Sequence, residues 1–191
     1  MTRTFIAVEL PDNVRAFLTR AIARLRRALP SVRWVDPASL HLTLAFLGEL
    51  DDDALAAAMT ATEEEASKGT PFTLRTGTLG TFGPRHVPRV IWIGVEGETA
   101  HVRALQEALA QRLEAAGFPR EQRPFSPHLT LARLKSPLAP EALTRLEALM
   151  HEPQHEHASW RVNEISVMKS ELGRGGARYI RLQAYPLGHS S

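Results

Sequence analysis

Two copies of one tetrapeptide carry side chains that could form an acid–base site. They are His41-Leu42-Thr43-Leu44 and His128-Leu129-Thr130-Leu131. A histidine can give or take a proton near neutral pH, and a threonine hydroxyl can donate a hydrogen bond to an anionic oxygen. Residues two apart in a β-strand point to the same face, so each His would share a face with its Thr while the leucines face a core. The repeat therefore predicts one site with an acid and a base on opposite sides of a substrate.

Two histidines and two hydroxyl donors suit in-line displacement at phosphorus. One His would take a proton from the attacking oxygen, the other would protonate the leaving oxygen, and the hydroxyls of Thr43 and Thr130 would hold the non-bridging oxygens. The symmetry of the motifs leaves open which His is the acid. Because the leaving oxygen departs with a proton, the scheme needs no metal ion, and we expect neither a metal nor a cofactor. The spacing of His151, His155 and His157 resembles a metal site, but their polar surroundings favour a surface loop.

Composition limits the kind of protein. The chain has 191 residues, 43% of them hydrophobic, and a net charge of +2. We expect a single bilobal domain over residues 1–191 with no membrane span and no signal peptide. The lack of cysteine excludes disulfides and thiolate chemistry and fits a cytoplasmic protein. The small net charge does not favour binding of a long nucleic-acid duplex, which usually involves a more basic surface.

Hydrophobic periodicity predicts an α+β fold in which each motif strand follows a helix and an irregular stretch. We expect Phe46 in the core, because strict alternation places it on the leucine face. Phe82 lies in a Gly/Pro-rich loop, where it could stack on a terminal base or anchor the loop to the core. The predicted strands are 4–8, 40–47, 72–79, 89–95, 126–134, 161–170 and 177–185, and the predicted helices are 11–29, 51–67, 99–116 and 140–150.

Over essentially its whole length the sequence resembles the 2H phosphoesterase superfamily, and within it the bacterial LigT-like RNA 2′,3′-cyclic phosphodiesterases, also called 2′-5′ RNA ligases. The two motifs, their order and the blocks between them carry the resemblance. Those blocks are Arg3-Thr4-Phe5-Ile6-Ala7-Val8, Trp34-Val35, Leu40 to Gly48, Phe82 and Pro84, Arg89 to Gly94, Pro127 to Arg133, and Ser166 to Leu172.

The resemblance implies a bilobal, pseudo-two-fold fold with antiparallel sheets around a central groove and helices outside. It implies that His41 donates a proton to the leaving 3′ oxygen and that His128 accepts one from water, so that a 2′,3′-cyclic phosphate at an RNA end becomes a 2′-phosphomonoester. A weak reverse ligation is also implied. We expect a monomer that acts on RNA ends, tRNA fragments or nucleotides.

The resemblance further implies that Arg133, five residues after His128, contacts the phosphate. Strict alternation would place Arg133 on the opposite face, so this role requires a bulge or a strand end after Leu131, or a neighbouring turn that brings the long side chain round. The alternative is a solvated or packing arginine.

Two other functions remain open at this stage. The first keeps the chemistry but acts on a small cyclic nucleotide or an ADP-ribose cyclic phosphate. The second is a non-catalytic nucleotide- or RNA-binding module, against which both intact motifs argue.

Overall fold

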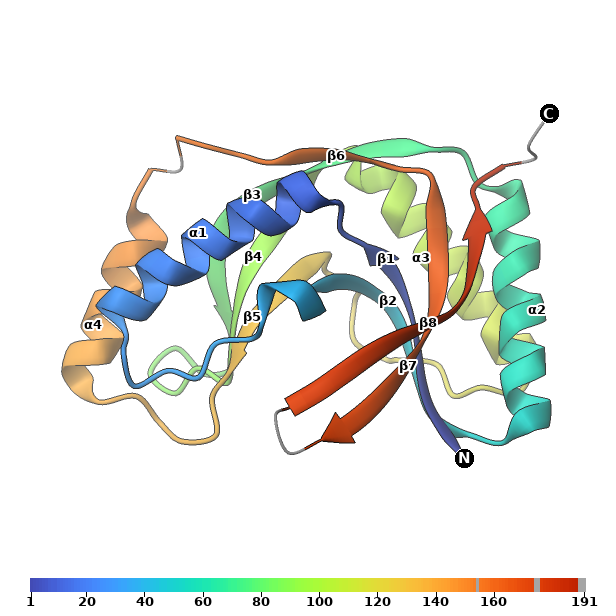
Figure 1. The fold of residues 1–191 in the computed structure, drawn as a ribbon, viewed down its shortest axis with the longest axis horizontal. Helices are drawn as coiled ribbons and strands as arrows, with labels where there is room; N and C mark the ends of the chain where they lie inside the picture. Colours follow the sequence, from blue (N-terminus) through green and yellow to red (C-terminus); the bar gives the residue numbers. More distant parts are fainter. Residues whose placement is uncertain (154, 174–175, 189–191) are drawn as a thin grey trace.

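Two four-stranded antiparallel sheets form the frame of the molecule (Figure 1). The computed structural model describes residues 1–153, 155–173 and 176–188. Sheet A has the strand order β2-β1-β7-β8, and sheet B has the order β5-β4-β3-β6. The strands are β1 (Thr2–Glu9), β2 (His41–Leu50), β3 (Phe72–Phe82), β4 (Val90–Gly97), β5 (His128–Arg133), β6 (Ser159–Val162), β7 (Glu164–Gly173) and β8 (Gly176–Pro186).

Four α-helices pack on these sheets: α1 (Asp12–Ala28), α2 (Asp52–Lys68), α3 (Thr99–Ala115) and α4 (Pro140–His151). In Figure 1, α1 and α4 lie beside the strands of sheet B, and α2 and α3 lie beside those of sheet A. Their apolar positions recur every three or four residues, as in the buried Val14, Leu18 and Ile22 of α1. None of the described helices is long and apolar enough to cross a membrane. The predicted α+β class with antiparallel sheets is confirmed.

The two sheets are built alike. In each, the strand that begins with a motif histidine lies at an edge and pairs with one inner strand, β2 with β1 and β5 with β4. The two edge strands meet, because the Trp34-Val35 segment just before β2 bridges to β5, with the Val35 amide donating to the Leu131 carbonyl at 2.8 Å. The fold thus brings both motifs to the junction between the sheets.

The end of the chain differs from the sequence prediction. One strand was expected at 161–170, but the structure has two, with a break at Asn163. β6 pairs with β3 in sheet B, and β7 pairs with β1 in sheet A, so the chain crosses from one sheet to the other at this residue. No Pro or Gly marks the crossing. The Asn163 carbonyl instead accepts from the Leu187 amide at 2.7 Å, a tertiary contact that local sequence cannot reveal.

A short 3-10 helix, η1 (Pro37–Ser39), was also not predicted. The Asp36 side chain caps it by accepting from the Ala38 amide at 3.0 Å. This turn ends two residues before His41, the first residue of β2.

Candidate active site

Equivalent hydrogen bonds orient the two motif histidines. The Nδ1 atom of His41 lies 2.9 Å from the Ser39 carbonyl, and that of His128 lies 2.7 Å from the Ser126 carbonyl. Each carbonyl belongs to the residue two positions before the histidine. Because a carbonyl oxygen only accepts, Nδ1 must carry the proton in both rings. The neutral histidines therefore keep Nε2 as the nitrogen that can accept a proton from a substrate.

The turns that hold these carbonyls are fixed by two equivalent arginines. Arg15, in the first turn of α1, donates to the Ala38 carbonyl at 2.5 Å and to the Leu10 carbonyl at 2.8 Å. Arg103, near the start of α3, donates to the Phe125 carbonyl at 2.5 Å. Ala38 and Phe125 both lie three residues before their histidine. The repeat thus extends beyond the motif to an arginine on a preceding helix, which the sequence analysis did not identify.

The motif strands have a bulge at the same position. Thr43 opposes Ala7 and Ala45 opposes Ile6, which leaves Leu44 as the extra residue in β2. Thr130 opposes Trp92 and Ala132 opposes Ile91, which leaves Leu131 as the extra residue in β5. Up to these bulges the predicted alternation holds. The leucines are buried, and His41, Thr43, His128 and Thr130 are half-buried.

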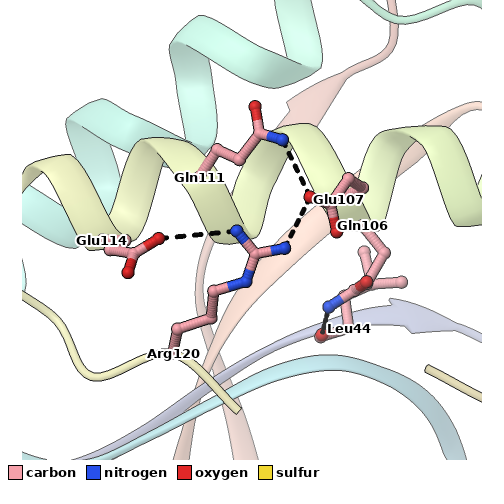
Figure 2. A network of polar contacts seen from close by, with 6 residues as sticks. All are labelled: Leu44, Gln106, Glu107, Gln111, Glu114 and Arg120. Atoms are coloured by element: carbon pink, nitrogen blue, oxygen red, sulfur yellow. Dashed lines mark hydrogen bonds and ion pairs between the residues drawn. The ribbon is translucent and has the colours of Figure 1, made fainter. Parts of the chain in front are cut away.

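Each bulge carbonyl has a partner from outside its sheet. Leu44 accepts from Gln106 Nε2 of α3 at 3.4 Å, and Leu131 accepts from the Val35 amide at 2.8 Å. Figure 2 shows the Gln106 contact beside a second network on α3, in which Arg120 bonds Glu107 at 2.5 Å and Glu114 at 3.4 Å. α3 therefore supports both motifs, because it holds the β2 bulge and the segment that leads to β5.

The bulges decide the position of the residue five places after each histidine. Beyond Leu131, Ala132 is buried and Leu134 packs on the core, so Arg133 turns to the face of His128 and Thr130. Beyond Leu44, Ala45 and Leu47 pack on the core, and Phe46 turns away from it. The prediction of Phe46 as a core residue was wrong: its side chain is 58% exposed. Phe46 and Arg133 are equivalent positions in the two halves.

Burial and positive charge lower the pKa of both histidines. Desolvation is the largest cause for each, and the bond to the serine carbonyl partly offsets it. The positive charge of Arg133 lowers the pKa of His41 and of His128. Arg15 lowers the pKa of His41 further, and Glu9 raises it.

Aromatic rings flank each histidine. Phe5 and Tyr179 lie 4.6 and 4.9 Å from the His41 ring, centroid to centroid. Phe82 lies 4.8 Å from the His128 ring, edge-on, and also contacts Trp92 at 5.1 Å. Phe82 is half-buried and is the last residue of β3, rather than part of the loop in which it was predicted. Base stacking on it stays a prediction.

A glycine makes room for the Trp92 indole. A Cβ atom added at Gly80 would lie 2.3 Å from that ring. The absence of a side chain on β3 at this point therefore allows Trp92 to lie next to Phe82 and His128.

Among the described residues, His151, His155 and His157 do not form the metal-like group that their spacing resembles. His151 Nδ1 donates to the Glu147 carbonyl at 2.7 Å on α4, and His157 Nδ1 donates to the Thr76 carbonyl at 2.6 Å on β3. Within the described ranges, no group of three or more His, Cys, Asp or Glu side chains could hold a metal ion. Residues 174–175, between the last two strands, lie outside the described ranges.

Sequence comparisons identify relatives over most of the chain. A family model described as the 2′-5′ RNA ligase superfamily matches residues 10–174. An RNA 2′,3′-cyclic phosphodiesterase from Methanothermobacter thermautotrophicus is 33% identical over 97% of this chain and 98% of its own length. One from Geobacillus stearothermophilus is 33% identical over 96% of this chain, which spans 56% of that relative's length.

Solved structures show the same architecture. E. coli LigT complexed with 3′-AMP superposes with a TM-score of 0.80 at 28% identity, covering 98% of this chain and 99% of LigT. TT0787 of Thermus thermophilus superposes with a TM-score of 0.78 at 31% identity, covering 99% of this chain and all of TT0787. The two-lobed arrangement of curled antiparallel sheets is shared over 98–99% of this chain.

The arginines on α1 and α3 give a first prediction. We expect Arg103→Ala to lower kcat of the reaction at this site roughly fivefold, the scale of one hydrogen bond of about 1 kcal/mol that holds the Phe125 turn. Arg15→Ala should cost more, because Arg15 also holds the end of β1. Stopped assays of kcat, with thermal melting as the folding check, measure both effects.

Arg26→Ala is the matched control, since Arg26 is an exposed arginine on α1. Unchanged kcat in both Arg15 and Arg103 variants, or an equal loss in the Arg26 variant, would show that the two contacts do not position the histidines.

Proposed function

The chain belongs to the 2′-5′ RNA ligase superfamily, and from this premise we propose that it is an RNA 2′,3′-cyclic phosphodiesterase, a phosphoric diester hydrolase. Its substrate is RNA with a 2′,3′-cyclic phosphate end, and its product is a 2′-phosphomonoester. One observation carries the proposal at this site: two histidines that are held by the same hydrogen bond through Nδ1, with Nε2 left for the substrate, begin two motif strands that meet at the junction of the two sheets.

We propose that the two histidines act in line across the phosphorus. His128 Nε2 accepts a proton from water as the water oxygen bonds to phosphorus, and the bond from phosphorus to O3′ breaks. His41, protonated on Nε2, gives that proton to O3′, which becomes a hydroxyl. The 2′ bond remains, so the terminus keeps a 2′-phosphate. Because O3′ is neutralised by His41 as it leaves, the step requires no Lewis acid.

The neighbouring donors fit the charge that develops on phosphorus. Thr43 and Thr130 share the faces of their histidines, and neither hydroxyl is bonded to another described protein group. Both are therefore able to donate to the non-bridging oxygens. Arg133 supplies a fixed positive charge on the same face, which stabilises the phosphorane-like transition state more than the singly charged diester.

The acid and base roles need an asymmetry that the motifs themselves lack. Glu9 lies opposite His41 in the β1–β2 ladder, whereas Gly94 takes the equivalent position opposite His128. A carboxylate favours a protonated imidazole, and Glu9 raises the pKa of His41, although burial is the largest cause and, together with the positive charges of Arg133 and Arg15, lowers that pKa. Glu9 is itself held by Arg181 at 2.5 Å and by the Ser166 hydroxyl at 2.8 Å. This supports His41 as the proton donor.

We further propose a monomer in which both lobes form one functional domain, because the site takes strands from both sheets. A cytoplasmic location is consistent with an RNA substrate and with a sequence that lacks cysteine. Weak 2′-5′ ligation would be the same displacement with an RNA 5′-hydroxyl in place of water: its oxygen bonds to phosphorus, its proton goes to His128, and O3′ leaves with the proton of His41.

The direct test is incubation of the protein with an oligoribonucleotide that ends in a 2′,3′-cyclic phosphate, in excess EDTA. We expect a 2′-phosphate end, identified by comparison with synthetic 2′- and 3′-phosphate standards. A 3′-phosphate product, or activity that returns only with a divalent ion, contradicts the scheme.

A substrate with sulfur at the 3′ leaving position separates the two histidines. Sulfur leaves without much help from a proton, so this substrate should rescue His41→Ala substantially and His128→Ala hardly at all. On the natural substrate each single substitution should cost at least about a hundredfold in kcat/KM. Equal rescue of both variants would refute the assignment, and rescue of His128→Ala alone would reverse it.

The lowered pKa values predict the pH profile. His128 must be neutral and His41 protonated, so kcat/KM should rise with pH through the pKa of His128 and fall through that of His41. Because both pKa values lie below the usual value of about 6.5, kcat/KM should already decline above that pH.

Arg133→Ala removes a positive charge that lowers both pKa values, so the whole profile should move to higher pH. Arg26→Ala removes the same charge from the outer face of α1 and should leave the profile in place. An unmoved profile in the Arg133 variant would place its guanidinium too far from the two rings to act on them.

A further inference from the structure

The two halves of the site match in strand pairing and in bulge position. The positions at which their residues differ are therefore the ones able to orient a substrate that is not symmetric. From each histidine to the residue five places later, the ladders of β2 with β1 and of β5 with β4 have the same pairing and the same bulge. At that fifth position one half has Arg133 and the other has Phe46. In the proposed function Arg133 contacts the phosphate. Its counterpart Phe46 cannot bind a phosphate in this way and would contact another part of the substrate.

Phe46 lies on the same face of sheet A as His41. It is directly opposite Phe5 in the β1–β2 ladder, and opposed residues point to the same face. Phe5 in turn contacts the His41 ring at 4.6 Å. An exposed phenylalanine alone is unremarkable. This one is 58% exposed on the face that carries the acid histidine, and along the described chain only Met1 is a more exposed large hydrophobic residue.

A cation accompanies the exposed ring. The guanidinium carbon of Arg3 lies 5.2 Å from the centroid of the Phe46 ring. Glu49 opposes Arg3 in the ladder, yet no ion pair involving Arg3 is formed among the described residues. An aromatic ring beside an unneutralised arginine is the combination that binds single-stranded nucleic acid, with the ring under a base and the charge near the backbone.

The direction of the proposed reaction places the RNA chain on the His41 side of phosphorus. Attacking and leaving oxygens lie on opposite sides of phosphorus in an in-line displacement. The leaving O3′ belongs to the terminal ribose, so the ribose and the nucleotides before it extend from the His41 side, while water enters from the His128 side. Phe46 lies roughly 15 Å along β2 from His41, at about 3.3 Å per residue. A mononucleotide held at His41 would leave Phe46 uncovered, whereas a longer chain would reach it.

We infer that Phe46 and Arg3 form a subsite for the nucleotides upstream of the cyclic phosphate, in which Phe46 stacks on a base and Arg3 contacts a backbone phosphate. The inference rests on the proposed function for the direction of the chain. An enzyme with this subsite would prefer a single-stranded RNA end several nucleotides long to a small cyclic nucleotide. Stacking recognises any base, so the subsite selects length rather than sequence.

The test compares a 2′,3′-cyclic mononucleotide with a six-nucleotide RNA that carries the same terminus. Phe46→Ala should lower kcat/KM for the six-nucleotide RNA about tenfold, mostly through KM, which is the scale of one stacked base. It should leave the mononucleotide reaction within about twofold of wild type. Phe46→Trp keeps a stacking surface and should retain activity on both substrates.

Arg3→Ala should raise KM for the six-nucleotide RNA and make that KM less dependent on salt concentration. Arg26→Ala, which removes a charge from α1, should change neither quantity. An equal loss on both substrates in Phe46→Ala, or no loss on the longer one, overturns the inference. Because Phe46 is exposed, the variant is expected to fold, and thermal melting checks this.

Binding distinguishes failure of the inference from failure of the proposed function. Fluorescence anisotropy with a labelled six-nucleotide RNA ending in a 2′-phosphate reads the subsite without catalysis. If the wild-type protein does not hydrolyse cyclic phosphates, the proposed function falls, and about tenfold weaker binding by Phe46→Ala would still support the subsite. If the wild-type protein hydrolyses them but Phe46→Ala binds this RNA normally, only the subsite falls.

Discussion

The hydrogen bond from each histidine Nδ1 to the carbonyl two residues earlier is the contact on which the rest of the site depends. It fixes the tautomer, so that Nε2 is the nitrogen left to exchange a proton with substrate. It also makes the conformation of a short turn part of the active site, because the carbonyl must stay in place for the ring to stay in place. Arg15 and Arg103 hold those turns from the preceding helices.

A second constraint comes from the edges of the sheets. A motif strand that pairs on only one side has carbonyls available to the rest of the molecule, and the bulge carbonyls of Leu44 and Leu131 bond to donors outside their own sheet. The bulges reverse the alternation of side chains partway along the strand. His, Thr and the residue five places after His can then lie on one face, although a regular strand would separate the last from the first two.

Symmetry and asymmetry have different parts in this molecule. The repeated features are those that any proton transfer to or from an oxygen on phosphorus would use: an oriented imidazole, a hydroxyl and a fixed turn. The differing features, Glu9 against Gly94 and Phe46 against Arg133, give the site a direction. A cyclic phosphate at an RNA end has a leaving side and an attacking side, so a strictly symmetric site could not distinguish the ribose from water.

The sequence by itself determined the motifs, the helices and most of the strands, because these follow from local periodicity of 2 or 3.6 residues, and the motif blocks supplied the family. The sequence also showed that strict alternation conflicts with a phosphate contact of Arg133. Phe46 was wrongly placed in the core, because β2 was treated as a regular strand without a bulge. Only the tertiary structure decided the bulges and the turns before the histidines. These depend on donors such as Gln106 and Arg103, which are 62 and 22 residues from their carbonyl partners. Contacts at such separations leave no mark on the pattern of neighbouring residues, because they depend on which surfaces the fold brings together.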